Sequence, residues 1–107
     1  MIALVFRYEV RDPEEFERAY GPNGEWSQFF RRGHGYIGTE LLRGLDEPER
    51  YLVIDRWESI DAYNGFLEEF RDEYLRRSDE TRLHHVQELR FGTFANVWDD
   101  EPDPSAP

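Results

Sequence analysis

The chain has no cysteine and no lysine among its 107 residues. Without cysteine it cannot form a disulfide, a thiol nucleophile or a thiolate metal site, and without lysine it cannot form a Schiff base with a carbonyl substrate. All 13 basic residues are therefore arginines, and 24 acidic residues outnumber them, which gives a formal net charge of -11. Because this charge repels phosphate groups, we expect neither a nucleic acid nor a membrane as partner.

The sequence also lacks a long apolar run and a basic leader. Its first ten residues, MIALVFRYEV, are typical of a strand rather than of a signal peptide or a membrane span, so we expect a cytoplasmic protein. The length suits one domain, which we place over residues 1–98. The remaining residues, 99–107, are acidic and rich in proline, and we expect them to be a disordered tail.

Apolar periodicity predicts the element order β-α-β-β-α-β. Strands are expected over residues 2–10, 36–43, 51–57 and roughly 84–94. Asp12 and Pro13 begin a first helical region, which the GPNG turn divides into two short helices, and Ser59 caps a second helix that ends before residue 78. The order predicts an α+β, ferredoxin-like sandwich with a four-stranded antiparallel sheet and the first and third strands at its centre.

The helices of such a sandwich cover only one face of the sheet. Apolar residues nevertheless occupy strand positions that we assign to the other face, namely Val5, Leu41, Leu52, Ile54 and Leu89 or their neighbours. A bare face of this kind would be a large exposed apolar patch, and packing it against the same face of a second copy is the common way to bury it. We therefore expect a homodimer formed through the sheet faces.

Three segments resemble the antibiotic biosynthesis monooxygenase family: GYIGTELLR, RWES and IDAYNGFLEEF, which begin at Gly35, Arg56 and Ile60. The resemblance covers roughly residues 2–94. It implies a dimeric α/β barrel in which each subunit holds a ligand between its sheet and its helices. The family includes cofactor-free oxygenases of aromatic polyketides and haem-degrading enzymes.

The haem-degrading branch of that family uses an asparagine on the first strand, a tryptophan near the end of the third and a histidine on the second helix. Trp57 matches the tryptophan, but the first strand has no asparagine and the second helix has phenylalanines where the histidine would lie. We therefore expect no haem, and no other cofactor.

Aromatic residues are frequent in the elements that would border the implied pocket. We assign substrate binding to eight of them: Tyr20, Trp26, Phe29, Phe30, Tyr63, Phe66, Phe70 and Tyr74. A flat polycyclic ligand suits such a wall, since offset stacking adds about 0.5–1.5 kcal/mol per ring pair beyond burial. The alternative interpretation is that these rings only fill the core, as aromatic stripes at helical spacing usually do.

An electron-rich aromatic substrate can reduce dioxygen once it is deprotonated, so the protein needs only an apolar pocket, a proton acceptor and a donor to the developing oxyanion. The catalytic candidates are Trp57, Asp55, His84 and His85. Asp55 could instead pair with Arg7 on the neighbouring strand. Adjacent histidines of a strand point to opposite faces and cannot bind one ion together, so no metal site is expected.

These residues are compatible with two functions. One is a cofactor-independent monooxygenase that acts on a small aromatic or quinol-like compound, and the other is a non-catalytic dimeric module that binds a hydrophobic small molecule. A third reading is a remnant whose pocket is filled by its own rings. A cavity would separate the first two from the third, and polar groups converging on one point would favour catalysis.

Overall fold

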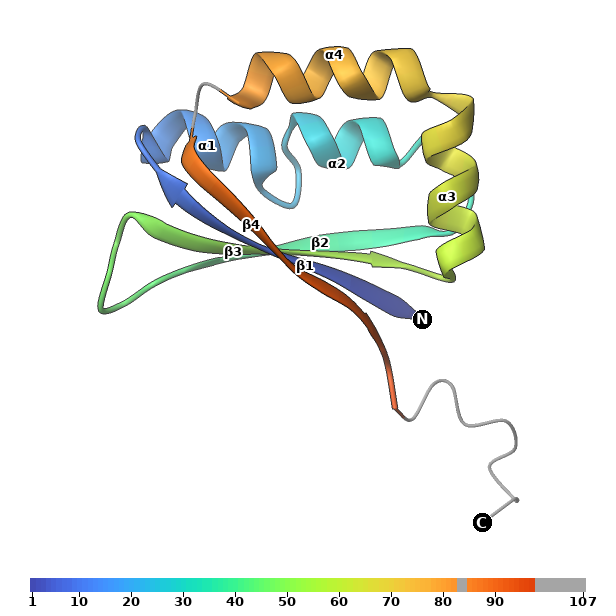
Figure 1. The fold of residues 1–107 in the computed structure, drawn as a ribbon, viewed down its shortest axis with the longest axis horizontal. Helices are drawn as coiled ribbons and strands as arrows, with labels where there is room; N and C mark the ends of the chain where they lie inside the picture. Colours follow the sequence, from blue (N-terminus) through green and yellow to red (C-terminus); the bar gives the residue numbers. More distant parts are fainter. Residues whose placement is uncertain (83–84, 98–107) are drawn as a thin grey trace.

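Four antiparallel strands form one sheet, and all the helices lie on one face of it (Figure 1). The computed structural model describes residues 1–82 and 85–97. The sheet order is β2-β3-β1-β4, so β1 and β3 are central as predicted. The strands are β1 (Ile2–Val10), β2 (Tyr36–Arg43), β3 (Arg50–Trp57) and β4 (His85–Ala95). This arrangement confirms the predicted α+β, ferredoxin-like fold. His84 and the predicted tail over 99–107 lie outside the described residues.

The first helical region consists of two short helices, as the GPNG turn predicts. Helix α1 (Pro13–Tyr20) begins at Asp12, whose side chain accepts a hydrogen bond from the backbone N–H of Glu15. Proline at the first helical position costs no hydrogen bond, because that N–H has no partner within the helix. Helix α2 (Glu25–Phe30) follows the turn, so two separate elements bring their aromatic residues over the sheet.

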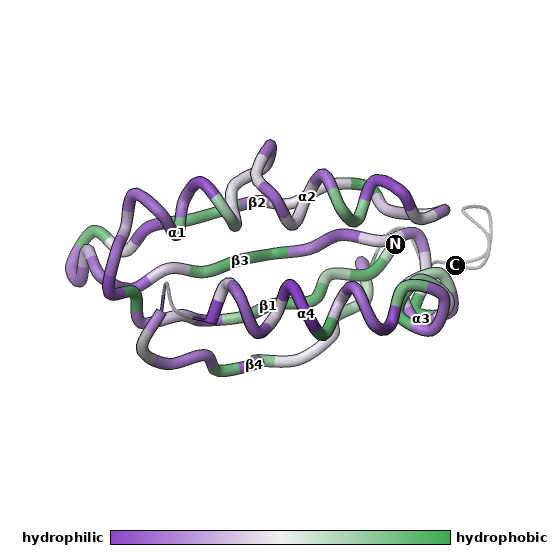
Figure 2. The backbone as a smooth tube through the Cα atoms, turned by 90° about the horizontal axis from the view of Figure 1, so that it is seen from above, coloured by the Kyte–Doolittle hydropathy of each residue, from purple (hydrophilic) through white to green (hydrophobic). Residues whose placement is uncertain are grey.

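The second helical region differs from its prediction, because it is two helices rather than one. Helix α3 (Ile60–Glu69) is capped by Ser59, and α4 (Arg71–Thr81) extends into the segment predicted to be a linker. The break is at Phe70, whose φ of -111° and ψ of 30° depart from helical values. Helix α3 therefore stands at one end of the sheet, while α4 runs above β1 and β4, beside the line of α1 and α2 (Figures 1 and 2).

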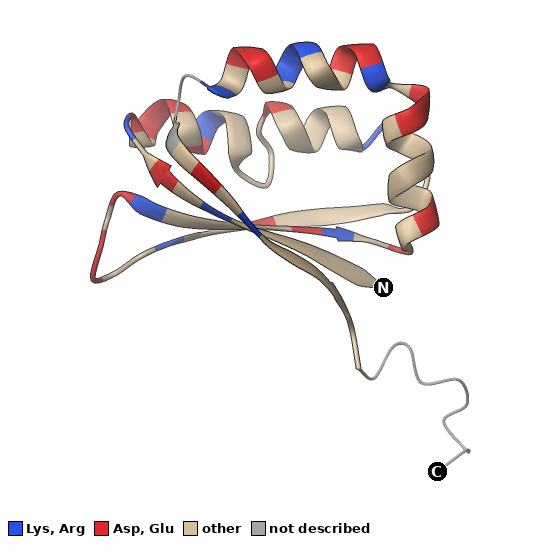
Figure 3. Cartoon of the chain, in the orientation of Figure 1, with Lys and Arg blue, Asp and Glu red and all other residues tan. Residues whose placement is uncertain are grey.

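Charged residues lie mainly on the outer helical layer and on the hairpin side of the sheet, and α2 carries few of them (Figure 3). Surface ion pairs such as Arg18–Glu15, at 2.7 Å, connect neighbouring turns of these helices. In the part of the chain that the structure describes, no helix has the length and apolar character needed to cross a membrane.

An aromatic core fills much of the space between the sheet and the helices. Phe16 is fully buried and stacks on Tyr20 with ring centroids 4.4 Å apart, and it also contacts Tyr8 and Tyr51 from the two central strands. Such tilted and offset ring pairs are favourable beyond the area they bury. Phe16 thus joins the first helix to the middle of the sheet.

The opposite face of the sheet is apolar and uncovered in the single chain. Its exposed large residues are between 42% and 52% accessible: Leu42, Leu89, Phe91 and Phe94. Leu41 itself is paired with Val53 and packs against the core, so on β2 the prediction holds for a neighbour rather than for Leu41. The outward residue of that strand is its neighbour Leu42, since side chains alternate along a strand.

The position of Phe16 predicts a large loss of stability on truncation. Phe16→Ala should lower the free energy of unfolding by about 3–5 kcal/mol, because the remaining rings cannot close the cavity it leaves. Leu45→Ala is the control, since Leu45 is 98% exposed and should change stability by less than about 0.5 kcal/mol. Urea unfolding followed by tryptophan fluorescence measures both, and equal losses for the two variants would contradict this account of the core.

Candidate functional site

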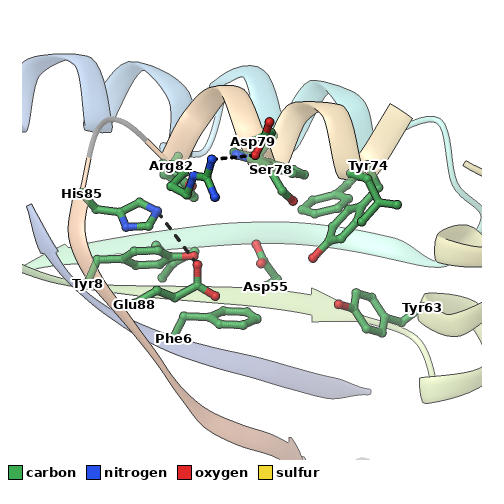
Figure 4. A pocket seen from close by; sticks show the side chains of 15 residues that line it. Phe6, Tyr8, Asp55, Tyr63, Tyr74, Ser78, Asp79, Arg82, His85 and Glu88 are labelled. Atoms are coloured by element: carbon green, nitrogen blue, oxygen red, sulfur yellow. Dashed lines mark ion pairs between the residues drawn. The ribbon is translucent and has the colours of Figure 1, made fainter. Parts of the chain in front are cut away.

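A cavity of about 390 Å³ lies between the sheet and the helical layer, below α4 (Figure 4). The alternative that the protein's own rings fill the whole interior therefore does not hold. The aromatic wall of the cavity comes from five elements and consists of Phe6, Tyr8, Tyr20, Trp26, Phe30, Tyr63 and Tyr74. A space of this size and lining suits a small aromatic molecule.

The cavity reaches solvent beside the C-terminal half of α4. Four of its lining residues are exposed: Leu75, Asp79, Arg82 and Glu88. Arg82 pairs with Asp79 at 2.8 Å, so the cation at the opening is already partnered. With Asp55 inside, acidic side chains outnumber basic ones around the cavity, which makes it less favourable to an anionic ligand than to a neutral one.

Asp55, in the C-terminal half of β3, is the carboxylate inside the cavity and is only 9% exposed. Burial raises its pKa from 3.8 to about 6, and a hydrogen bond from the Thr39 hydroxyl to Oδ1, at 2.7 Å, acts in the opposite direction. The predicted ion pair with Arg7 is wrong. Arg7 is paired with Leu52 and its guanidinium lies over the ring of Phe91, on the other face of the sheet.

The hydroxyls of Tyr63 and Tyr74 point into the same space as the Asp55 carboxylate (Figure 4). Tyr63 comes from α3 and Tyr74 from α4, so the break at Phe70 lets both rings reach one point. Burial raises the pKa of Tyr63 and also that of Tyr74. Both phenols therefore stay protonated at neutral pH and can donate hydrogen bonds to an oxyanion.

At the other side of the cavity, the hydroxyl of Thr81 orients two aromatic rings of the wall. The Thr81 hydroxyl accepts hydrogen bonds from the Tyr20 hydroxyl and from the Trp26 indole N–H, both at 3.2 Å, and donates to the backbone carbonyl of Arg77. Burial raises the pKa of Tyr20 to about 12. These bonds orient two cavity rings against the last turns of α4.

His85 is the predicted histidine that the structure places at the cavity. Its ring packs edge-on against Tyr8, with centroids 4.8 Å apart, and its Nε2 lies 4.0 Å from the Glu88 carboxylate. The imidazole thus has both an apolar and an acidic neighbour. His84, the other predicted histidine, lies outside the described residues.

Four of the predicted site residues lie outside the cavity lining: Trp57, Phe29, Phe66 and Phe70. Trp57 is fully buried and packs against Phe30 and Tyr63, two rings of the cavity wall, with centroids 5.7 and 5.5 Å apart. Among the described residues its indole N–H has no hydrogen-bond partner. For these four residues the core-filling interpretation describes the structure, whereas five of the eight predicted binding rings do line the cavity: Tyr20, Trp26, Phe30, Tyr63 and Tyr74.

Sequence reasoning missed Phe6, Tyr8 and Glu88 as lining residues. The first two were detectable, because they alternate on β1 with Leu4, a buried residue of the helix-facing side. Glu88 had no such signal, since the registers of β1 and β4 shift between Glu9 and Val10 and between Val5 and Phe6. Within residues 1–82 and 85–97, no group of three histidine or acidic side chains is placed to hold a metal ion.

The raised pKa of Asp55 predicts a pH-dependent effect on stability. Between pH 3.8 and about 6 the folded chain keeps a proton that the unfolded chain releases, so Asp55 stabilises the fold at low pH and this contribution is lost as the pH rises through about 6. Asp55→Asn should therefore gain stability relative to wild type on going from pH 4 to pH 8, by roughly 2 kcal/mol. Urea unfolding of both proteins at the two pH values measures the difference, and a difference independent of pH would contradict the buried position of this carboxyl.

Comparison with known proteins places this chain in one family. The family model described as antibiotic biosynthesis monooxygenase matches residues 1–76. No curated protein matches the chain. Among solved structures, a variant of SnoaB, a cofactor-independent oxygenase from Streptomyces nogalater, is 26% identical, covers 90% of this chain and 92% of its own, and has a TM-score of 0.75.

Two further structures share the fold at lower identity. A protein of Nitrosomonas europaea assigned to the antibiotic biosynthesis monooxygenases is 18% identical, with a TM-score of 0.66 over 91% of this chain and 99% of that one. A variant of MhuD that holds two manganese protoporphyrin IX molecules per active site is 20% identical, with a TM-score of 0.64 over 91% and 95%. The extent of the family match, together with the fold, shows that this chain belongs to the antibiotic biosynthesis monooxygenase family.

Proposed function

We propose that this protein is a cofactor-independent monooxygenase that oxidises a small, neutral aromatic or quinol-like compound in the cavity below α4. The observation that carries the proposal is the convergence of a buried carboxylate, Asp55, with the hydroxyls of Tyr63 and Tyr74 inside an aromatic wall. The similarity to SnoaB, a cofactor-independent oxygenase, supports the same class of reaction.

In this proposal Asp55 removes the first proton from the substrate. A carboxyl whose pKa is about 6 is mostly ionised at neutral pH and is a stronger base than an ordinary aspartate. Tyr63 and Tyr74 donate hydrogen bonds to the substrate oxygen, where negative charge develops. Trp57 lies behind Phe30 and Tyr63, so it supports the wall and does not contact the substrate.

The deprotonated ring then reduces dioxygen, and the atoms balance without a further reductant. For an anthrone-like substrate, one oxygen atom becomes a carbonyl on the ring carbon, and the other leaves as water with the two hydrogens of that carbon. The substrate supplies all four electrons that reduce the dioxygen molecule. The protein contributes the base, the hydrogen-bond donors and an enclosure that stacks on the ring.

Oxygen uptake with anthrone and with a naphthohydroquinone tests the reaction. The wild type should raise uptake above the spontaneous rate, and Asp55→Asn should lower kcat/KM by at least about 100-fold, as expected for the loss of a general base. Asp46→Asn, in the exposed hairpin loop, is the matched control and should keep wild-type activity.

Two results would contradict the oxygenase. One is uptake no faster than the spontaneous rate with both probes, and the other is full activity of Asp55→Asn. If the probes quench tryptophan fluorescence in the absence of uptake, the protein is instead a non-catalytic binding module of the same fold.

The functional unit in this proposal is a homodimer formed through the open sheet face. That face exposes four large apolar side chains from β2 and β4, namely Leu42, Leu89, Phe91 and Phe94, and Leu52 and Ile54 of β3 are half-buried between them. Uncovered apolar surface of this kind is unfavourable in water, and a second copy offers the complementary surface under two-fold symmetry.

Light scattering coupled to size exclusion should therefore give twice the 12.9 kDa mass of one chain. Phe91→Glu places two added charges at the proposed interface and should shift the protein to monomer. Leu45→Glu adds the same charge in an exposed loop and should leave the dimer intact. A wild-type monomer at micromolar concentration would rule out this assembly.

A further inference from the structure

A chain of hydrogen bonds lies behind Asp55, on the side away from the cavity. The Thr39 hydroxyl donates to Asp55 Oδ1 at 2.7 Å, and the Tyr36 hydroxyl lies 2.5 Å from the oxygen of Thr39. Neither Tyr36 nor Thr39 is among the residues that line the cavity. Thr39 therefore contacts the cavity's carboxylate directly, Tyr36 acts on it through Thr39, and neither residue contacts the contents of the cavity.

The direction of these bonds follows from the number of protons. A threonine hydroxyl has a single hydrogen, and Thr39 gives it to the ionised Asp55. The Tyr36 hydroxyl must then be the donor in the second bond. Both hydroxyl dipoles point toward the carboxylate, and each bond strengthens the other.

A β-bulge makes this arrangement possible. Residues 36 and 39 are three positions apart, so in a regular strand their side chains would lie on opposite faces. The register of β2 shifts here: Tyr36 is paired with Trp57 and Thr39 with Asp55, while Gly38 is paired with Arg56. The extra residue, Ile37, brings both hydroxyls to the helix-facing side, and bulges of this kind often re-aim a side chain beside an active site.

We propose that Thr39 and Tyr36 are positioning residues for Asp55, which hold Oδ1 in a hydrogen-bonded chain so that Oδ2 faces the cavity in its ionised form. The role of Oδ2 as a base rests on the proposed function, whereas the hydrogen-bonded chain itself does not. Among the described residues, Thr39 is the one hydrogen-bond donor to this carboxylate. Oδ2 is then left for a proton from the substrate.

The chain of hydroxyls opposes the effect of burial. Burial disfavours the charged carboxylate, and the bond from Thr39 favours it, which leaves the pKa of Asp55 at about 6. The other titratable groups that line the cavity are Tyr8 on β1, Tyr20 on α1, Tyr63 on α3, Tyr74 and Asp79 on α4, Arg82 directly after α4, and His85 and Glu88 on β4. Burial raises the pKa of all four tyrosines, so they stay neutral in this range.

Site-resolved titration of the Asp55 carboxyl carbon by ¹³C NMR tests the proposal without a substrate, and it separates Asp55 from His85 and Glu88. Thr39→Val removes the hydroxyl at nearly constant volume and should raise the Asp55 midpoint by about one to two pH units. Thr39→Ser keeps a donor and should stay close to wild type. Tyr36→Phe should give a smaller upward shift, because it removes only the second bond.

Thr93→Val is the matched control, because Thr93 lies on β4 and its hydroxyl accepts from Arg90 rather than contacting Asp55. An Asp55 midpoint that is unchanged or lower in Thr39→Val would overturn the proposal, as would an equal upward shift in the control. Should Thr39→Val unfold, Tyr36→Phe is compared with wild type instead. An Asp55 midpoint that does not rise in Tyr36→Phe would then contradict the proposed chain of hydrogen bonds.

The same variants separate this inference from the proposed function. If the midpoints shift as expected and neither probe drives oxygen uptake, the positioning chain stands and the oxygenase fails. If oxygen uptake depends on Asp55 and the Asp55 midpoint does not move in Thr39→Val, the oxygenase stands and the proposed positioning role of Thr39 and Tyr36 fails. If both hold, the acidic limb of kcat/KM should move in Thr39→Val by the same number of pH units as the carboxyl titration.

Discussion

Helices on only one face of a four-stranded sheet are the constraint on which the rest of this structure depends. That arrangement divides the sheet into a covered side, where Leu4, Tyr8 and Trp57 are buried, and an open side that exposes leucine and phenylalanine. The covered side can enclose a cavity, because its helices stand off the sheet on bulky aromatic residues. The open side leaves apolar area that a single chain has no element to bury.

The break at Phe70 determines where the cavity lies. A single long helix from Ser59 would cross the sheet in one direction, whereas the corner lets α3 stand at the end of the sheet and α4 lie over β1 and β4. Tyr63 and Tyr74 thereby approach Asp55 from two directions. The ring of Phe70 packs between Phe66 and the Arg32 guanidinium, with centroid distances of 4.9 and 4.7 Å, and these contacts hold the corner in place.

Asp55 shows how a polar group is kept in an aromatic interior. A buried carboxylate without a partner would be costly, and the common solution is an arginine on a neighbouring strand. Here Arg7 lies on the other face of the sheet, and neutral hydroxyls take the place of the ion pair. A neutral partner leaves the charge of the carboxylate uncompensated, so its pKa stays above the ordinary value, which suits a group that must accept a proton.

The sequence by itself determined the strands, the first helices and the two-sided sheet, because apolar periodicity, Asp12-Pro13 and the GPNG turn act locally. It also identified Asp55 and five of the cavity rings, since side-chain alternation and helical spacing specify the face on which a residue lies. Only the tertiary structure decided that Trp57, Phe66 and Phe70 pack inside the core and that Phe6 and Tyr8 line the cavity. Which rings line the cavity depends on how far the helices stand from the sheet, and no local pattern encodes that distance. The β2 bulge that brings Tyr36 to Thr39 depends on pairing with β3, which is likewise not a local property of the sequence.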